Sequence, residues 1–554
     1  MLFRAKQHLD AEVYAGSSPT STEALSGPLT DNWHLSLPNA GPDESVPLEK
    51  MNSGGVSCSF LKSPYFEAPA RLQTFIQSGK RERAQSMTSP KLLHGLASYC
   101  ILDTSLKRVL STDLPTLVRR ADEGLRQGLE PILTDDSMGG TYFLRDPSKV
   151  ICLVFKPSDE EPAAPFNPRQ KPEMIGKTRP AYKGGIIPGF GIFREVVAFA
   201  LDDGFAGVPP THIAKVRHPS FRSSASGFSL PNPQPFTHKI GSVQCYVRNL
   251  STAEDVSPSL LDKDDLQRIA ALDIRICNLD RHTGNMLVSR ESPYQTQLKN
   301  SSNTREYNDE DSDLMRFMDP GNNPFPDDWV GSAPVTHGAY MWDHLDYRTG
   351  PGRRPAHSGK LRVVPIDHGY CIPHILHLND INFAWLYWSP CKEPVSTAIR
   401  EQIAQIDVDK DIATIHALVG AAVPETSILT LRVCTSLLKK GIAAGLTLHE
   451  IGVQIAGHGY FPEEGDRTPL QFIVSTAVDR VLSALDDHVA TSPSSFSLSK
   501  SFTSNPCVRS ASGPRQVDEE QLDRALRVDG GRALMRELEL MVDMLVRSAA
   551  SQVP

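Results

Sequence analysis

The sequence predicts an α+β protein of two lobes, a small β-rich lobe followed by a larger, mainly helical lobe. Three observations carry this prediction. Two short β-rich runs lie on either side of residue 147, an apolar helical pattern begins at residue 193, and helical texture dominates from about residue 367 to residue 487. The chain has 554 residues and is 40% hydrophobic, so it is long and apolar enough to bury a large core.

The small lobe is predicted to contain a helix and a hairpin. Residues 117–125 (LVRRADEGL) have a helical pattern. Residues 141–144 and 150–155 are β-rich, and the Arg-Asp-Pro-Ser between them is a turn signal. Residues 157–191 are rich in Pro and Gly, and their last part, 184–191 (GGIIPGFG), is predicted to be a flexible loop that does not hold a nucleotide.

The next elements alternate between helix and strand. A helix is predicted where apolar residues fall at i, i+3, i+4, i+7 and i+8, namely Phe193, Val196, Val197, Ala200 and Leu201. Asp264 or Asp265 is expected to cap a second helix over 266–277. Residues 289–360 are polar and contain many Pro and Gly, which predicts a long insertion, and 361–366 (LRVVPI) is predicted to be a strand.

One domain is therefore predicted over residues 115–487, with different segments on either side of it. Residues 1–90 are rich in Ser, Pro, Gly and Thr and are predicted to be disordered. Residues 488–516 are predicted to be a linker, because seven serines fall within 492–504. An amphipathic helix is predicted over 517–550, with Leu534, Leu538, Met541 and Leu545 at heptad-like spacing.

Composition argues against several classes of protein. The net charge of −8 argues against a strongly basic nucleic-acid binder. The nine cysteines are odd in number and form no C-x-x-C pair, which argues against a disulfide scaffold or a zinc ribbon and favours a reducing compartment such as the cytoplasm. No run of about 18 apolar residues predicts a membrane span, and the first sixteen residues do not resemble a secretory signal.

Four polar positions follow one another in an order that suggests one type of chemistry. Lys156 ends a β-rich run. Glu195 lies on the apolar helix that follows, where a carboxylate requires a cationic partner such as Lys156. Asp280 and Asn285 stand five residues apart in DRHTGN, and Asp367 directly follows the strand predicted over 361–366.

This set matches the needs of phosphoryl transfer, which are a cation on the nucleotide phosphates, bound metal ions and a carboxylate near the attacking hydroxyl. Each position alone has an ordinary explanation, such as a surface lysine, a glutamate in a first helical turn or an aspartate in a turn. Their joint order favours the functional interpretation. A fifth feature, Ser137, Gly139, Gly140 and Thr141, offers backbone N–H groups and hydroxyls that suit phosphates.

Six strings together resemble a known family. They are VFKPSDEEP, FREVVAF, GVPPT, LDIRICNLDRHTGN, PIDHGYCIP and WLYW. From about residue 117 to about residue 452 the chain resembles the phosphatidylinositol 3-/4-kinase superfamily, in particular the type II-like phosphatidylinositol 4-kinases of the gamma class. This resemblance implies a bilobal protein-kinase-like fold. It also implies a lipid kinase that uses ATP with Mg²⁺ or Mn²⁺ to phosphorylate the 4-hydroxyl of phosphatidylinositol in a membrane surface.

The resemblance also implies roles for the residues that bind ATP and metal. Lys156 corresponds to the lysine on the ATP phosphates, and Glu195 to its helix partner. Asn285 and Asp367 correspond to metal ligands, and Asp367 also contributes to the nucleotide site. Two short segments complete the nucleotide site: Ser137, Gly139, Gly140 and Thr141 as the phosphate-binding loop, and Gln244, Cys245, Tyr246 and Val247 as the hinge that hydrogen-bonds adenine through its backbone.

Asp280, Arg281 and His282 correspond to the catalytic residues of the same family. Two of them are candidates for the general base. A histidine has an unperturbed pKa near 6.5. An aspartate has one near 3.9, but it can orient a hydroxyl without full proton transfer. The sequence does not choose between Asp280 and His282.

The chain departs from the family pattern in three segments. The insertion over 289–360 is longer than the family pattern leads us to expect. Residues 1–90 do not look like the N-terminal ubiquitin-like repeats that plant gamma-class members usually carry. The loop over 163–191 contains no cysteine, whereas animal type II enzymes have a Cys-rich palmitoylated stretch there. We therefore expect membrane access without that lipid anchor, which is either peripheral or mediated by protein partners that the sequence does not identify.

Three interpretations have alternatives. The aromatic cluster 383–388 (FAWLYW) lies either in the core of the larger lobe or at a membrane interface, where Trp and Tyr are favoured. The acceptor of the phosphoryl group is either a lipid or, as in protein Ser/Thr kinases of the same fold, a protein. The enzymatic function itself has an alternative of another class, which is a non-catalytic, membrane-associated scaffold.

Overall fold

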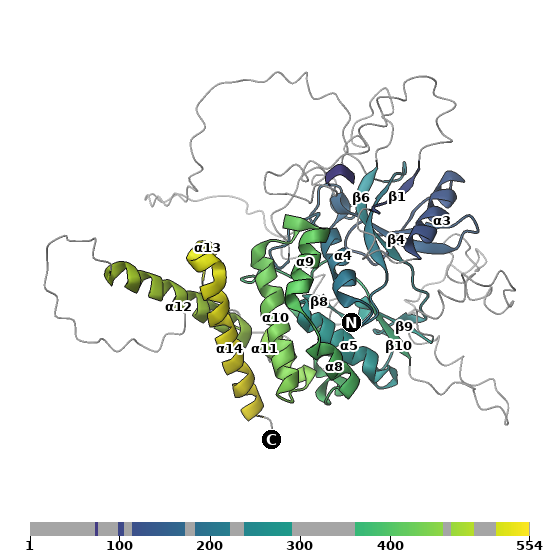
Figure 1. Cartoon of the computed structure of the whole chain (residues 1–554). Helices are drawn as coiled ribbons and strands as arrows, with labels where there is room; N and C mark the ends of the chain where they lie inside the picture. Colours follow the sequence, from purple (N-terminus) through teal and green to yellow (C-terminus); the bar gives the residue numbers. More distant parts are fainter. Residues whose placement is uncertain are drawn as a thin grey trace, which may run out of the picture. The chain divides into compact units, whose positions relative to one another are not determined.

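The computed structural model describes residues 73–75, 98–104, 113–171, 183–221, 238–290, 361–457, 467–491 and 517–552. Contacts divide the chain into two units, Met1–Gly54 and Gly55–Pro554, and every described residue belongs to the second. In that unit, the strands of one large sheet precede most of the helices (Figure 1). Together with the family match reported below, this arrangement agrees with the predicted α+β fold of two lobes.

The small lobe is built on a six-stranded sheet in the order β1-β5-β6-β4-β3-β2, and all neighbouring strands are antiparallel. The predicted hairpin is present as β3 and β4, and Lys156 lies on β4. Its strands are β1 (Cys100–Leu102), β2 (Ile132–Leu133), β3 (Tyr142–Arg145), β4 (Ile151–Pro157), β5 (Thr211–Val216) and β6 (Lys239–Cys245).

Helices cover both faces of this sheet. The predicted helix over 117–125 is α3 (Leu114–Arg126), and the helix that carries Glu195 is α4 (Gly191–Asp202). Successive residues of a strand point to opposite faces. On β5, Ile213 belongs to the apolar cluster around α4, whereas Ala214 belongs to the cluster around α3. Because both faces are covered, every residue of β5 and β6 is buried.

The larger lobe is mainly helical in its described part, as predicted. Two small sheets accompany its helices: an antiparallel one in the order β10-β9-β7, and a parallel pair β11-β8. The strands are β7 (Ser251–Thr252), β8 (Asp280–Arg281), β9 (Met286–Ser289), β10 (Arg362–Pro365) and β11 (Asn382–Phe383). The helices are α5 (Lys263–Arg275), α8 (Thr397–Ala404), α9 (Val408–Leu418), α10 (Glu425–Ala443), α11 (Leu448–Ala456) and α12 (Pro469–Thr491). Short 3₁₀ turns lie at Ser158–Glu160, Pro258–Leu260, Thr283–Asn285, Ala384–Tyr387, Ser389–Lys392 and Gly420–Ala422.

The expected cap of α5 was wrong by two or three residues. Asp262 is the N-cap, because its backbone is extended and its carboxylate accepts a hydrogen bond from the Asp265 N–H at 3.0 Å. Asp265 lies inside the helix, and its carboxylate accepts from Arg362 and from the Val363 N–H on β10. The strand predicted over 361–366 is therefore confirmed as β10 and is tied to α5.

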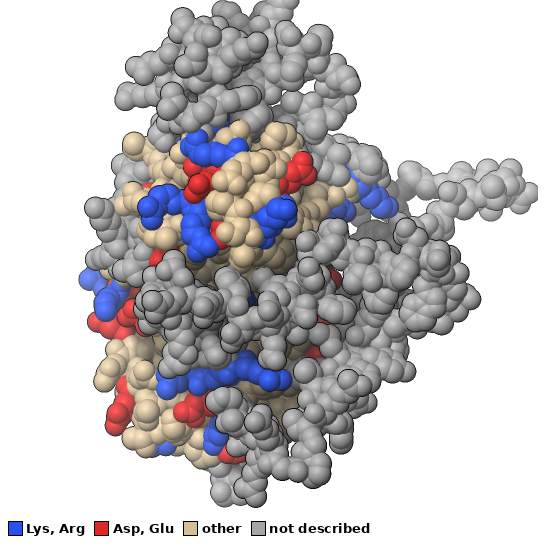
Figure 2. Space-filling view, turned by 90° about the vertical axis from the view of Figure 1, so that its right-hand side faces the viewer, with Lys and Arg blue, Asp and Glu red and all other residues tan. Residues whose placement is uncertain are grey.

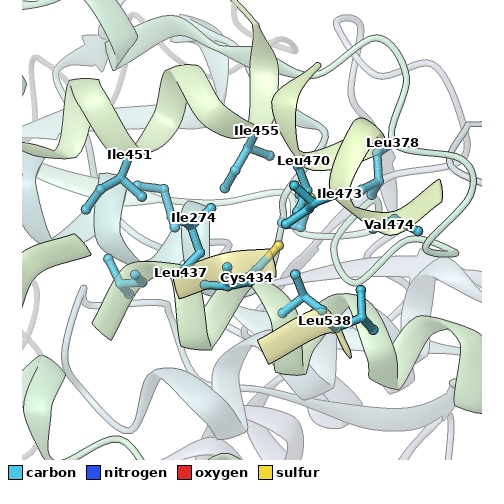
Figure 3. Close-up of a cluster of buried hydrophobic side chains, with 14 of the residues drawn as sticks. Ile274, Leu378, Cys434, Leu437, Ile451, Ile455, Leu470, Ile473, Val474 and Leu538 are labelled. Atoms are coloured by element: carbon cyan, nitrogen blue, oxygen red, sulfur yellow. The ribbon is translucent and has the colours of Figure 1, made fainter. Parts of the chain in front are cut away.

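A continuous apolar core holds the helices of the larger lobe together (Figure 3). In this close-up Ile274 of α5 and Leu437 of α10 lie next to Ile451 of α11, and Leu538 reaches the same cluster. The aromatic segment 383–388 belongs to this core: Trp385 is fully buried and stacks on Phe383 at a ring-centroid distance of 4.8 Å. Burial decides between the two alternatives in favour of the core.

The single helix predicted over 517–550 is two helices. They are α13 (Glu519–Arg527) and α14 (Arg532–Ser551), and the left-handed backbone of Asp529, Gly530 and Gly531 separates them. The helix α14 lies alongside α10 and α12 (Figure 1). Its predicted apolar positions face this contact, since Leu534, Leu538 and Met541 are buried and Leu545 is partly buried. None of the described helices is long and apolar enough to cross a membrane.

Several predicted segments lie wholly or partly outside the described residues. Of residues 1–90 only 73–75 are described. They are helical, with the Phe75 ring 4.4 Å from the Lys215 ammonium, so these three residues do not fit the predicted disorder. Of the predicted insertion, 291–360 lies outside the described residues. The predicted linker begins later than expected, because α12 extends to Thr491, and 492–516 lies outside the described residues.

Candidate active site

Three of the predicted residues meet between the two lobes. The Lys156 ammonium on β4 lies 2.5 Å from Glu195 Oε1 on α4 and 2.9 Å from Asp367 Oδ1, which follows β10. The second Glu195 oxygen accepts a hydrogen bond from the His368 N–H at 3.1 Å. Glu195 is only 2% exposed, so its charge is compensated inside the protein by these contacts. The strand, the helix and the segment after β10 are thus joined at one lysine.

The charges of this cluster shift one another's pKa. Burial lowers the pKa of Lys156, but Asp367 and Glu195 outweigh it and raise that pKa above its usual value. Burial raises the pKa of Asp367, but the Lys156 charge outweighs it and lowers the pKa to about 2. The stability contributed by a carboxyl group with a lowered pKa is present at any pH above the pKa of that group in the unfolded chain. It is lost as the pH falls through the lower pKa that the group has in the folded protein. The Lys156–Asp367 pair therefore stays charged at neutral pH.

Arg281, which the sequence placed among the catalytic residues, does not lie in the open site. It is fully buried, and its guanidinium accounts for the path of residues 280–285, the predicted catalytic loop. It pairs with Asp273 at 3.0 Å and donates to the carbonyls of Asn285 and Ile366, both at 2.6 Å. A side chain enclosed in this way holds the loop in position from the interior of the protein.

The same arginine fixes the state of the histidine after Asp367. An Arg281 Nη2 lies 2.8 Å from His368 Nε2, and a guanidinium only donates, so this nitrogen accepts. Burial, followed by the Arg281 charge, lowers the pKa of His368 well below its usual value. His368 is therefore neutral and holds the segment of Asp367 against the catalytic loop.

Asp273 on α5 is the centre of this buried network, and the sequence interpretation missed it. Its carboxylate accepts from Arg281, from Asn278 Nδ2 at 3.1 Å and from Trp385 Nε1 at 3.0 Å. The sequence does contain a signal for it, because Asp273 lies on the apolar stripe of a helix, where an unpaired charge is costly. The same reasoning that paired Glu195 with Lys156 applies to it.

Asp280 and His282 lie on the partly exposed side of the catalytic loop, whereas Asn285 is buried. The Asp280 carboxylate is 29% exposed and lies 2.9 Å from Lys183 Nζ. Asn285 donates from Nδ2 to the Asp280 carbonyl at 3.0 Å, and its own carbonyl accepts from the Ile366 N–H at 3.1 Å. His282 is partly exposed and its charge also lowers the pKa of Asp367. Asp280, His282, Asn285 and Asp367 therefore belong to one site.

Asn285 and Asp367 have the donor chemistry of a site for a divalent cation. Mg²⁺ takes oxygen ligands, usually one or two carboxylates together with substrate phosphates and water. A carboxylate and a side-chain amide both offer oxygen ligands of this kind. In the described part of the chain no three His, Cys, Asp or Glu side chains are grouped as ligands for a metal ion.

The segment with Ser137, Gly139, Gly140 and Thr141 is the tip of a hairpin that the sequence did not predict. It joins β2 to β3, and β2 has only two residues, too few to show an alternating pattern. The Ser137 hydroxyl donates to the Gly139 carbonyl at 2.8 Å. The Gly140 N–H donates to the Glu160 carbonyl at 2.8 Å. The tip is thus held against the turn that follows β4.

Close packing explains why glycine stands at position 140. A Cβ atom there would lie 2.2 Å from Glu160 Oε2, a carboxylate that also accepts from the Tyr142 hydroxyl at 2.6 Å. Gly140→Ala is therefore expected to displace the tip and to weaken ATP binding about tenfold, because overpacking costs roughly 1–3 kcal/mol. Ser148→Ala, on the exposed turn of the next hairpin, is the matched control. Equal ATP affinity in the two variants would show that the tip does not contact the nucleotide.

The segment 184–191, predicted to be a flexible loop, is held at both ends within the described residues. Glu161, from the string EEP, accepts from the N–H groups of Gly189, Gly191 and Ile192 at 2.6, 3.1 and 2.8 Å. Burial raises the pKa of Glu161 to about 7, although these backbone donors oppose the shift. The carboxylate closes the N-terminus of α4 and so fixes the helix that carries Glu195.

The predicted hinge lies at the end of β6, but two of its backbone donors are already used. The Cys245 N–H donates to the Pro210 carbonyl and the Tyr246 N–H to the Cys152 carbonyl, at 2.9 and 3.1 Å. A small gap lies between the end of β6 and Lys156, lined by Val154, Lys156, Glu195, Thr211, Ser242 and Gln244, and it is too narrow to admit a water molecule.

Comparisons with known proteins agree with this geometry. Residues 137–451 match the family described as phosphatidylinositol 3- and 4-kinase. Phosphatidylinositol 4-kinase gamma 3 of Arabidopsis thaliana is 34% identical over 61% of this chain and 49% of the relative. Phosphatidylinositol 4-kinase gamma 4 of the same plant is 30% identical over 67% of this chain and 54% of the relative. Phosphatidylinositol 4-kinase gamma 4 of Oryza sativa subsp. japonica is 29% identical over 70% of this chain and 58% of the relative.

The chain therefore spans 49% to 58% of the length of these three relatives. The matched residues begin at the tip between β2 and β3 and end within α11. They include the lysine, the helix glutamate, the catalytic loop and the aspartate after β10. From this match and from the geometry of the site, we conclude that the chain belongs to the phosphatidylinositol 3- and 4-kinase family.

Proposed function

We propose that the protein is a lipid kinase that transfers the γ-phosphoryl group of ATP to the 4-hydroxyl of phosphatidylinositol and gives phosphatidylinositol 4-phosphate. The observation that carries this proposal is the Lys156 ammonium between Glu195 and Asp367, beside the catalytic loop of Asp280. The choice of acceptor and of the ring position rests on the names of the relatives.

The site residues divide into three roles in this proposal. Lys156, with the tip that contains Gly140, holds the phosphates of ATP, and the backbone near Val247 holds the adenine. Asn285 and Asp367 hold the divalent cation, which we propose to be Mg²⁺, with Mn²⁺ as a substitute. When bound, the cation supplies positive charge that neutralises the phosphates.

The acceptor hydroxyl is placed at Asp280 and His282 in this proposal. Phosphoryl transfer depends mainly on positioning and on electrostatic stabilisation, so a carboxylate near the hydroxyl is sufficient to orient it. The buried Arg281–Asp273 pair keeps the backbone of both residues in place. Removal of the hydroxyl proton then falls to Asp280 or to His282.

We further propose that the protein works in the cytoplasm, peripherally attached to a membrane that contains the lipid. Figure 2 shows the face that lies on the right in Figure 1, and on its described residues Lys and Arg are interspersed with Asp and Glu. On α3, which lies on that side, Arg126 pairs with Asp122 and Arg120 with Asp146.

The experiment that tests the function compares acceptors. The full chain with γ-labelled ATP and Mg²⁺ is offered phosphatidylinositol vesicles and, separately, a mixture of protein substrates. We expect label in the lipid and none in the proteins, at a rate that is lost in Asp367→Asn. Label in the protein substrates alone would indicate a protein kinase of the same fold. If neither acceptor is labelled, the result would favour the alternative of a non-catalytic, membrane-associated scaffold.

A further inference from the structure

A lysine that no sequence motif singled out contacts the catalytic loop. Lys183 Nζ lies 2.9 Å from Asp280 Oδ1, although the two residues are 97 positions apart in the chain. The side chains are 20% and 29% exposed, so the pair borders the open site. A cation therefore stands next to the carboxylate at which the acceptor hydroxyl is proposed to lie.

The backbone that carries Lys183 is fixed without this ion pair. Gly184 has a φ of +64°, and a Cβ atom there would lie 2.4 Å from Leu279 Cδ1 and 2.8 Å from Pro373 Cβ. The Gly184 carbonyl accepts a hydrogen bond from the His374 N–H at 3.0 Å. Partly exposed ion pairs contribute about 0–1 kcal/mol. The pair with Asp280 is therefore not needed to anchor the loop, and the fixed backbone keeps the ammonium within reach of Asp280.

Lys183 also has donors left for a second acceptor. An ammonium carries three N–H donors, and within the described residues the Lys183 side chain donates to Asp280. Two other cations lie near the described catalytic loop. Arg281 is enclosed by Asp273 and backbone carbonyls, and Lys156, which contacts two carboxylates, is assigned to the ATP phosphates in the proposed function. Lys183 is thus placed to take an anionic group that arrives with a substrate.

We infer that Lys183 binds a phosphate group of a substrate at the catalytic loop and is a further catalytic residue of this site. This inference rests on the proposed kinase function. The phosphate belongs either to ATP, as the γ-phosphate, or to the lipid, as the phosphodiester of its headgroup. In both cases the ammonium neutralises negative charge next to Asp280, where carboxylate and phosphate would otherwise repel each other. The half-exposed apolar side chain of Ile187, in the same segment, suits a substrate that lies in a membrane.

The test measures binding of two soluble probes, ATP and glycerophosphoinositol, to the full chain with Mg²⁺. In Lys183→Met the dissociation constant of one probe is expected to rise about 10- to 100-fold, the range for a lost hydrogen bond to a charged group. A weaker affinity for ATP assigns Lys183 to the γ-phosphate. A weaker affinity for glycerophosphoinositol assigns it to the headgroup phosphodiester.

Two further variants separate this role from a structural one. Lys183→Arg keeps the charge and is expected to restore binding to within about threefold, and Lys410→Met, on the exposed side of α9, is the matched control. The inference is overturned if both dissociation constants stay within twofold of the wild type. It is also overturned if Met and Arg at position 183 weaken binding equally and lower the melting temperature together. Wild-type protein that binds ATP but phosphorylates no lipid would instead contradict the proposed function.

Discussion

Asp367→Asn is expected to abolish phosphoryl transfer, with a loss of about 10²–10³-fold or more in kcat. The carboxylate is the metal ligand of the proposed site and one of the two partners of Lys156, and charge aimed at the transferring phosphoryl group is the main source of catalysis in such reactions. Asparagine is chosen because Asp367 has a φ of +57°, a conformation that asparagine tolerates. The fold is therefore expected to survive while the charge is lost.

The control for this variant is Asp380→Asn. Asp380 has a φ of +54° and is exposed, so the same substitution is made in the same backbone conformation away from the site. Label transfer and the melting temperature are measured for both variants. If Asp367→Asn keeps more than a tenth of the wild-type rate at saturating Mg²⁺, Asp367 does not hold the metal ion.

Arg281→Met is expected to destabilise the larger lobe by about 3–5 kcal/mol, the cost of leaving one partner of a buried ion pair alone. The substitution leaves Asp273 charged and fully buried, and it removes the donors of two backbone carbonyls in the catalytic loop. Urea unfolding followed by fluorescence measures the change, and Arg400→Met on the exposed side of α8 is expected to shift stability by less than about 0.5 kcal/mol.

The stability measurement also decides how Arg281 acts. If Arg281 only positions the loop, its replacement lowers stability and activity together. The enzyme that remains folded then keeps an unchanged KM for ATP. If Arg281→Met unfolds like the wild type and yet loses transfer, the arginine touches the reacting groups and its assignment to the interior is wrong.

The sequence predicted the parts of the site that local patterns mark. Lys156 ends a β-rich run, Glu195 lies on an apolar helix, and Asp367 follows a short strand. Each of these positions is defined by the residues next to it in the chain. Because an apolar helix gives a carboxylate few partners, the pairing of Glu195 with Lys156 was also predictable, and the structure has it at 2.5 Å.

Contacts between distant segments were not predictable in the same way. Lys183 lies in a segment whose glycines suggested flexibility, and only its packing on Leu279 and Pro373 shows that it is held in place. Asp273 and Arg281 are eight residues apart, but the pattern of α5 does not reveal which loop its buried carboxylate supports. The break between α13 and α14 depends on three left-handed residues, Asp529, Gly530 and Gly531, a feature that a periodic pattern does not record.

The chemical identity of the product tests the central claim most directly. The full chain is incubated with γ-labelled ATP, Mg²⁺ and phosphatidylinositol vesicles, the lipid is deacylated, and the labelled inositol phosphate is separated by chromatography. We predict one labelled product, glycerophosphoinositol 4-phosphate, which is absent with Asp367→Asn. Label at another ring position would contradict the proposed specificity, and consumption of ATP with no labelled lipid at all would contradict the assignment as a lipid kinase.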